Sequence, residues 1–311
     1  MRKAFIKTLT ELAEKDNRIF ILAGDLGFGV FDDFAKKFPG RFINCGVAEQ
    51  NMMGVAAGLA MAGKKPYVYS IVPFVTLRCL EQIRNDICYQ NLDVKIIGYA
   101  GGFSYGTLGS THSVLEDVAV LRALPNMTVL CPADFAQTEK LILKSYETSN
   151  PTYIRLMNIG QNKVFNSSQD LEIGRPQVLT EGKDGAIIAT GVEVNSCLEV
   201  IKKLKDNGLS FKLINAHTLK PIDKEKLLAE IKGIKNVFTV EEHSVIGGLG
   251  GAVAEILAES DWQGSFKIIA IPDEYPSEIG SADYLRKKYR LDAEQITTQI
   301  LDANKQKTDA D

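Results

Sequence analysis

The chain has 311 residues and a formal charge of −3, from 36 Lys and Arg against 39 Asp and Glu. Hydrophobic residues make up 45% and charged residues 24%, which is typical of a globular protein long enough for two domains. No polybasic run is present, so a nucleic-acid partner is not expected, because phosphate binding needs concentrated Lys and Arg. The most apolar stretches, residues 51–62 and 185–190, are shorter than the roughly 20 residues of a membrane span, so no membrane partner is expected either.

The cysteines and the first residues indicate the compartment. The charged, amphipathic residues 1–15 predict a surface helix and not a signal peptide. The five cysteines are odd in number and have no C-x-x-C spacing, which argues against a disulfide framework or a metal knuckle. We therefore expect free thiols and a cytoplasmic protein.

The first half of the chain alternates short apolar runs with helical patterns. Apolar residues at helical spacing predict a first helix over residues 5–13. The pattern then predicts strands over 18–23, 42–45, 67–71, 94–99 and 128–131, and helices over 49–62, 75–89, 115–124 and 136–146. Such alternation is typical of a mostly parallel sheet covered by helices on both faces.

A polar segment separates this half from a second α/β unit. The second unit has predicted strands over 185–190, 211–215, 236–241 and 267–271, and predicted helices over 194–207, 224–231 and 248–259. The fold class is therefore two tandem α/β domains with mostly parallel sheets. We place the domains at 1–160 and 179–303, the linker at 161–178 and a frayed polar tail at 304–311.

Glu49 is the first candidate for a catalytic or ligand-binding residue. It lies between a predicted strand end and a helix rich in small residues, and open α/β sheets bind ligands at the carboxyl ends of their strands. A carboxylate there can also simply stabilise the helix N-terminus through the helix dipole. The residues alone leave both interpretations open.

The surrounding sequence resembles a known family. Residues 46–60, GVAEQNMMGVAAGLA, resemble the segment of transketolases whose glutamate activates thiamine diphosphate. The resemblance continues through residues 81–87, 111–117, 121–129, 132–134, 189–191 and 241–250. It implies a pyrimidine-binding domain followed by a transketolase C-terminal domain.

The resemblance implies specific cofactor contacts. Glu49 would hydrogen-bond the aminopyrimidine ring and act as the catalytic carboxylate. Phe74 matches an aromatic residue on which that ring stacks, whereas Ile71 and Leu77 stand where the family has other aromatic residues. Asp25 matches a family aspartate near the thiazolium ring, although a strand-end aspartate can also only cap the next segment.

The positions that the resemblance assigns to substrate depart from the family pattern. Ala100 and Leu108 replace a histidine and an aspartate, and only His112 is retained. The resemblance implies a catalytic His112 in polar contact with substrate, although it can also be a structural histidine at a helix N-terminus. Arg2 and Arg155 resemble arginines that hold the acceptor phosphate, although Arg2 can equally be a solvated charge. Loss of a hydrogen-bonding aspartate changes substrate preference more than cofactor chemistry, so we expect an unusual sugar substrate.

The diphosphate-binding domain of a full transketolase has no counterpart in this sequence. Its G-D-G…N signature is missing, and the only G-D pair, at 24–25, belongs to the pyrimidine domain. The resemblance therefore implies an N-terminal partner subunit that holds the diphosphate and Mg²⁺, in an α2β2 heterotetramer, and no metal site on this chain. We expect the glycine run 247–251 to pack a strand-to-helix turn, and no metal to bind at His243 beside Glu241 and Glu242.

The function implied is transfer of a two-carbon ketol unit from a ketose to an aldehyde. Two alternatives remain open from the sequence. One is a thiamine enzyme that decarboxylates a 2-oxo acid, such as a deoxyxylulose-phosphate synthase or a dehydrogenase beta subunit. The other is a non-catalytic partner subunit.

Overall fold

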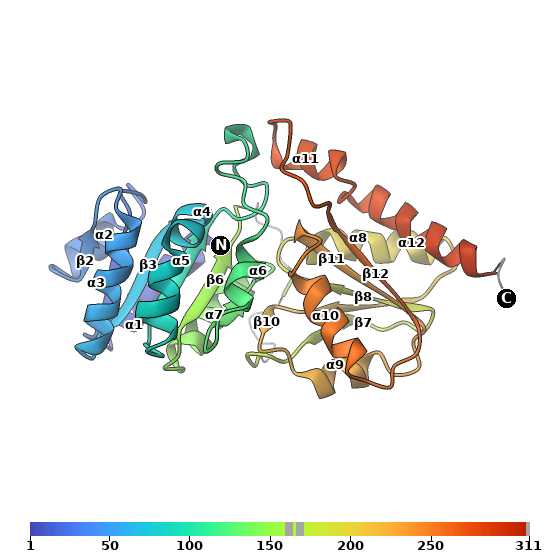
Figure 1. Ribbon diagram of the computed structural model, residues 1–311, viewed down its shortest axis with the longest axis horizontal. Helices are drawn as coiled ribbons and strands as arrows, with labels where there is room; N and C mark the ends of the chain where they lie inside the picture. Colours follow the sequence, from blue (N-terminus) through green and yellow to red (C-terminus); the bar gives the residue numbers. More distant parts are fainter. Residues whose placement is uncertain (159–163, 166–170, 309–311) are drawn as a thin grey trace.

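The computed structural model describes residues 1–158, 164–165 and 171–308. These form two α/β domains that lie side by side, with the N-terminal domain in blue to green and the C-terminal domain in yellow to red (Figure 1). The predicted fold class is confirmed. Within the described residues, no helix is both long and apolar enough to cross a bilayer.

The first sheet has seven strands in the order β10-β5-β6-β4-β3-β1-β2, and all but β10 run parallel. Apolar, β-branched runs supply its buried strands. These are β1 (Ile19–Ala23), β2 (Phe42–Asn44), β3 (Lys65–Ile71), β4 (Lys95–Tyr99), β5 (Thr128–Leu130) and β6 (Thr152–Leu156). The longer helices of this domain are α1 (Arg2–Ala13), α2 (Asp32–Lys37), α3 (Glu49–Met61), α6 (Asp117–Arg122) and α7 (Phe135–Tyr146).

The second sheet has five strands in the order β12-β11-β8-β9-β7, with β7 antiparallel at one edge. Its strands are β7 (Gln177–Thr180), β8 (Gly185–Ala189), β9 (Phe211–Asn215), β11 (Asn236–Ser244) and β12 (Ser265–Ile271). Its helices are α8 (Glu193–Asp206), α9 (Lys224–Glu230), α10 (Leu249–Ala258), α11 (Ala282–Lys288) and α12 (Ala293–Thr308).

One strand of the first sheet comes from the second domain. β10 (Thr218–Lys220) belongs to the second domain by sequence, yet it pairs antiparallel with β5 of the first sheet, with Thr218 opposite Leu130. The backbone N–H of Cys131 also donates to the carbonyl of His217 at 2.8 Å. The first sheet therefore includes a strand contributed by the second domain, and this pairing ties the two domains together.

The predicted helix over 75–89 is helical from Leu77 to Cys88, but it is not one regular α-helix. The segment forms α4 (Val72–Val75), the 3₁₀ turn η1 (Leu77–Cys79), α5 (Leu80–Gln82) and the π-helical η2 (Ile83–Cys88). Thr76 interrupts the helix because its φ of −117° and ψ of −81° are not helical. The break turns the chain at the carboxyl end of β3.

The sequence prediction missed several elements and misplaced two boundaries. β6, β7, β10, α2, α11 and α12 were not predicted. β7 begins at Gln177, inside the range expected to be linker, and α12 continues to Thr308, inside the range expected to be a frayed tail. Part of the predicted linker, 161–163 and 166–170, lies outside the described residues.

Candidate active site

Glu49 begins α3 and lies at the carboxyl edge of the first sheet, with a side chain that is only 2% exposed. Ser70 Oγ donates to its Oε1 at 3.4 Å, and Arg78 Nη1 donates to its Oε2 at 2.7 Å. Gly24 closes a third side, since a Cβ built there would lie 3.1 Å from Oε1. The carboxylate is therefore sheltered from water, walled by the ends of β1 and β3, and one of its oxygens has only a long hydrogen bond.

Phe74 and His112 extend the site from Glu49. The guanidinium carbon of Arg78 lies 4.2 Å from the centre of the Phe74 ring, in cation–π geometry. The His112 ring meets Phe74 edge to face at a centroid distance of 5.2 Å, and its Nδ1 lies 3.0 Å from Thr111 Oγ1. The structure thus brings together three of the residues singled out in the sequence, Glu49, Phe74 and His112, through Arg78.

Arg2 reaches the same edge from α1. Its guanidinium carbon lies 4.9 Å from the centre of the Tyr99 ring. Tyr99 in turn meets Tyr105 at 6.3 Å, and Tyr105 meets His112 at 6.4 Å. A row of aromatic rings therefore connects Arg2 with His112.

The positions of Ala100 and Leu108 are shaped by their loop. Ala100 is buried at the end of β4 with a left-handed φ of 62°, whereas Leu108 is exposed on the turn η3 (Gly106–Leu108). Neither residue offers a polar side chain beside His112. The structure places Leu108 on a surface where a polar residue would cost little to accommodate.

The other predicted cofactor residues are Ile71, Leu77 and Asp25. Ile71 ends β3 and is buried, and Leu77 packs against the hydrophobic core under α3. Asp25 is exposed with a φ of 52°, and it is held by Asn44, whose Oδ1 accepts from the Asp25 N–H at 3.1 Å and whose Nδ2 donates to Asp25 Oδ1 at 3.0 Å. The contact between Asp25 and the cofactor stays a prediction.

Arg155, the second predicted phosphate ligand, is bonded inside the protein. Its buried guanidinium donates to Asp117 through Nε at 2.9 Å and through Nη2 at 3.1 Å. Nη1 and Nη2 also donate to the backbone carbonyls of Glu242 and Val114. These contacts give Arg155 a structural role at the domain junction, and its contact with a substrate phosphate stays a prediction.

The E-E-H segment at 241–243 also makes contacts at the domain junction. Glu241 accepts from the backbone N–H groups of Leu249 and Gly250, both at 2.7 Å, and so caps the N-terminus of α10. A Cβ on Gly248 would lie 2.0 Å from Glu241 Oε2, which confirms that the glycine run packs a tight strand-to-helix turn. His243 accepts at Nε2 from the Ala119 N–H at 3.3 Å.

The second domain holds the loop after β4. Glu242 accepts from the Phe103 N–H at 2.8 Å, Ser110 Oγ donates to the Pro276 carbonyl at 2.9 Å, and the Gly280 N–H donates to the Gly106 carbonyl at 3.2 Å. Figure 1 shows this green loop rising beside α11. The loop that carries Leu108 and His112 is therefore fixed from both domains.

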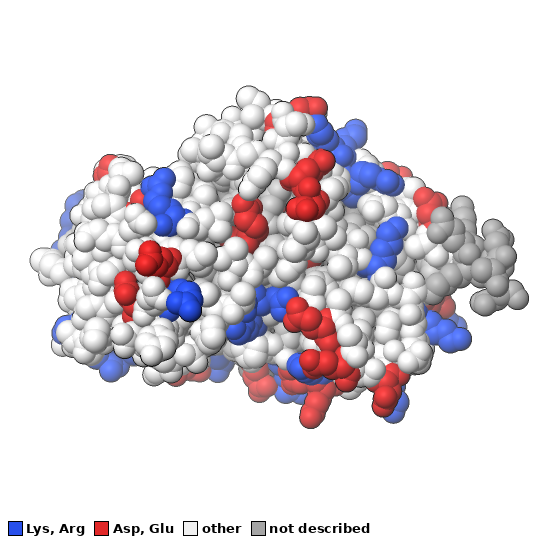
Figure 2. Space-filling view, viewed as in Figure 1, with Lys and Arg blue, Asp and Glu red and all other residues white. Residues whose placement is uncertain are grey.

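Charge is distributed without a basic stripe. In Figure 2 both signs are interspersed over the visible face, and the upper projection that contains the loop after β4 is largely uncharged. Among the described residues there is no group of three or more His, Cys, Asp or Glu side chains that could hold a metal ion. The side chains that could meet a cofactor here are thus a carboxylate and an aromatic ring.

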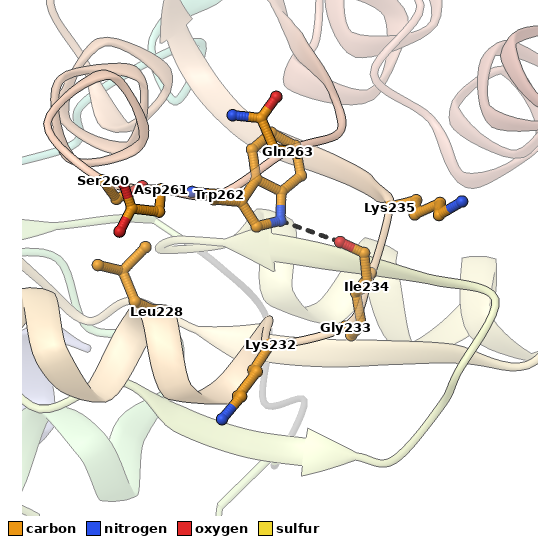
Figure 3. A pocket seen from close by; sticks show the side chains of 9 residues that line it. All are labelled: Leu228, Lys232, Gly233, Ile234, Lys235, Ser260, Asp261, Trp262 and Gln263. Atoms are coloured by element: carbon orange, nitrogen blue, oxygen red, sulfur yellow. Dashed lines mark hydrogen bonds between the residues drawn. The ribbon is translucent and has the colours of Figure 1, made fainter.

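A separate surface pocket lies at the opposite end of the second sheet, where β11 and β12 begin. Trp262 lines it and donates through Nε1 to the Ile234 carbonyl at 2.9 Å, while Lys232 and Lys235 point away from the indole (Figure 3). Because these charged groups do not converge, we assign no ligand to this pocket.

Sequence reasoning missed Arg78 and Ser70, which are the two hydrogen-bond donors to Glu49. A weak signal was present for Arg78, since it follows Phe74 by only four residues, but Thr76 breaks the helix between them and the i,i+4 rule of a regular helix does not apply. For Ser70 no comparable signal exists, because its contact with Glu49 depends on the pairing of β3 with β1.

Comparison with known proteins agrees with this architecture. Residues 1–159 match the family "Transketolase, pyrimidine binding domain", and residues 174–296 match "Transketolase, C-terminal domain". A Methanocaldococcus jannaschii protein named as a transketolase C-terminal section is 41% identical over 98% of this chain and 96% of its own length.

Two further relatives carry names that mention substrates. A Phocaeicola vulgatus protein, named as one of the subunits of an apulose-4-phosphate transketolase, is 37% identical over 97% of this chain and 96% of its own length. A protein of a Clostridium species, named as one of the subunits of a 6-deoxy-6-sulfo-D-fructose transketolase, is 36% identical over 95% of this chain and 92% of its own length.

A solved structure has the same fold over nearly the whole chain. It is described as a split gene transketolase in an inactive beta4 tetramer, with a TM-score of 0.88, 40% identity and 97% coverage of both chains. The chain therefore belongs to the transketolase family, and it consists of the pyrimidine-binding and C-terminal domains of that family.

Proposed function

We propose that this chain is the C-terminal subunit of a two-subunit, thiamine-diphosphate-dependent transketolase, which transfers a two-carbon ketol unit from a ketose donor to an aldehyde acceptor. The observation that carries the proposal is the buried Glu49 carboxylate, which Arg78 links to the Phe74 ring. An aminopyrimidine needs these two groups together, an acceptor at its edge and an aromatic face beneath it. A side chain at Gly24 would crowd the carboxylate, so the glycine keeps Glu49 accessible to a flat ring, and the residues fit the cofactor.

The residues of this chain would have distinct roles. When bound, thiamine diphosphate supplies the carbanion needed to break and form a carbon–carbon bond next to a carbonyl group. Glu49 would hold a proton between its carboxylate and the aminopyrimidine nitrogen, since burial strengthens such a hydrogen bond. Phe74 would position the ring, and His112, in contact with Phe74, would face the reacting sugar.

A second polypeptide would complete the site. The described residues gather no metal-binding group, so the partner would hold Mg²⁺ and the diphosphate. We place the contact on the exposed face of α3, where Gly54 and Gly58 have open space above them and Val47 and Met61 are exposed. Because α3 begins at Glu49, a partner bound along this helix would also cover the cofactor, and two copies of each subunit would form an α2β2 heterotetramer.

The substrate would be an unusual sugar. Ala100 and Leu108 offer no polar side chain to a sugar hydroxyl, and relatives at similar identity are named for different ketoses. A cytoplasmic location also belongs to the proposal, and the five cysteines support it, because all are free thiols and four of them are buried.

The test is the Glu49→Gln variant in the assembled enzyme. We expect kcat to fall by about 10²- to 10⁴-fold with the thermal unfolding midpoint of this subunit retained, because only the proton-holding group changes. Glu147→Gln, which alters an exposed carboxylate at the end of α7, is the matched control and is expected to keep full activity. Full activity of Glu49→Gln would overturn the proposal, and 2-oxo acids used as donors in place of ketoses would redirect it to decarboxylation.

A further inference from the structure

Arg78 contacts the Glu49 carboxylate and the Phe74 ring, the two groups that a bound aminopyrimidine would need. Its Nη1 donates to Glu49 Oε2 at 2.7 Å, and its guanidinium carbon lies 4.2 Å from the centre of the Phe74 ring. A guanidinium is flat, carries donors along its edge and stacks on aromatic faces. It therefore satisfies the carboxylate and the ring in the way a flat heteroaromatic base does.

We propose that Arg78 is a positioning residue that competes with the aminopyrimidine for Glu49 and Phe74 and leaves them when thiamine diphosphate binds. The inference rests on the proposed function and deepens it. Before binding, Arg78 neutralises a carboxylate that is almost completely buried. A buried charge without a partner is strongly destabilising, so the pair with Arg78 helps to stabilise the folded subunit before the cofactor binds.

Two features of the pair make it releasable. The Arg78 side chain is 40% exposed, so its charge is already partly hydrated and can move into solvent at a small cost in free energy. The other Glu49 oxygen, Oε1, keeps its contact with Ser70 and is not occupied by Arg78. The Asp117–Arg155 pair is built differently, with both partners buried and four hydrogen bonds that hold the guanidinium in place.

Release of Arg78 would couple cofactor binding to the segment that carries it. Arg78 lies in η1, between the irregular turn at Thr76 and the short helix α5. This segment also contacts α3, whose exposed face is the proposed partner surface. Movement of Arg78 away from Glu49 would therefore take place in a segment that packs on the helix carrying the proposed subunit interface.

The experiment measures the dissociation constant of thiamine diphosphate, with Mg²⁺, by calorimetry on the assembled two-subunit protein. For Arg78→Met we expect binding that is about three- to tenfold tighter, because the competing ion pair is gone. Arg78→Lys keeps the charge without the flat face and should lie between Arg78→Met and the unchanged protein. Arg18→Met removes another half-exposed arginine from a buried carboxylate, Asp16, at the opposite edge of the sheet, and is expected to leave the constant unchanged.

A second readout uses this chain without cofactor. Arg78→Met should lower its midpoint of urea unfolding, and adding Glu49→Gln to the same chain should restore part of the loss, since the buried charge is then removed. Equal or weaker cofactor binding in both Arg78 variants would overturn the proposal. Absence of binding in the unchanged assembly would instead contradict the proposed function, so the two failures are distinguishable.

Discussion

Asp117 and Arg155 form a buried, two-pronged ion pair at the junction of the domains, with Nε 2.9 Å from Oδ2 and Nη2 3.1 Å from Oδ1. Tyr153 donates to the same Oδ2 at 2.6 Å. Because Arg155 also donates to the carbonyl of Glu242 in β11, the pair fastens the first domain to the second. The position that the family resemblance assigned to a substrate phosphate is thus part of the protein's internal support.

Arg155→Met should therefore act on stability. We expect a loss of about 3 kcal/mol in the free energy of unfolding, since Asp117 is left buried without its cation. Urea unfolding measures the loss, and Arg175→Met, which removes an exposed pair with Glu172, should change it by less than about 1 kcal/mol. A stable Arg155→Met variant with only a raised KM for phosphorylated sugars would contradict this account.

Gly102 is predicted to tolerate no side chain. A Cβ there would lie 1.9 Å from Glu242 Oε1, and the residue has a φ of 59°. Gly102→Ala should lower the free energy of unfolding by about 2 kcal/mol or more, measured by thermal unfolding. The methyl group would clash with Glu242, which accepts from the Phe103 N–H, and the positive φ would add backbone strain. Gly208→Ala, at a φ of 80° with open space above it, isolates the strain alone and should cost less. Equal costs would show that Glu242 moves aside freely.

Leu108 is predicted to influence sugar preference. Leu108→Asp adds an acceptor on an exposed turn near His112, so we expect little change in stability and a shift of about tenfold in the ratio of kcat/KM between donor ketoses. A panel of ketoses with the assembled enzyme measures this ratio, alongside the affinity for thiamine diphosphate, which should stay the same. An unchanged ranking of ketoses would remove Leu108 from the substrate site.

Glu193 should make stability depend on pH. Burial raises the pKa of Glu193 to about 8, helped by the charge of Glu242 and opposed by Arg286, while the unfolded chain titrates near 4.5. The stabilising contribution is complete below the unfolded pKa and is lost as the pH rises toward 8, because only the folded protein holds the proton in that range.

Glu193→Gln should remove this dependence. From about pH 5 to pH 8 the free energy of unfolding of the unchanged chain should decrease as Glu193 loses its proton. For Glu193→Gln we expect this decrease to be smaller by at least about 1 kcal/mol. Urea unfolding across the range measures both slopes, with Glu199→Gln, an exposed position on the same helix, as control. Identical slopes would mean that Glu193 is ionised in the folded state at neutral pH.

Local sequence patterns predicted most of the sheets. The apolar runs of β1, β8 and β9 are bounded by turn residues, so their strands could be placed within a residue or two. The convergence of Glu49, Phe74 and His112 at one edge follows from the same pattern, because parallel strands end at a common edge. Their catalytic roles stay predictions.

The features that the sequence did not reveal depend on long-range contacts. β10 has only three residues, and its place in the first sheet is decided by pairing with β5, almost 90 residues earlier along the chain. Arg155 forms a local pattern that matches a phosphate ligand, but Asp117, 38 residues away, determines its surroundings. The helical break at Thr76 likewise reflects the packing of the following residues beneath α3.

The most direct test of the account is calorimetric titration of thiamine diphosphate with Mg²⁺ into this chain alone and into its mixture with an N-terminal partner that has a diphosphate-binding domain. We expect binding only in the mixture, because this chain supplies Glu49 and Phe74 for the pyrimidine while the partner holds the diphosphate. Tight binding to this chain alone would contradict the account, since a diphosphate site would then lie within the two domains described here.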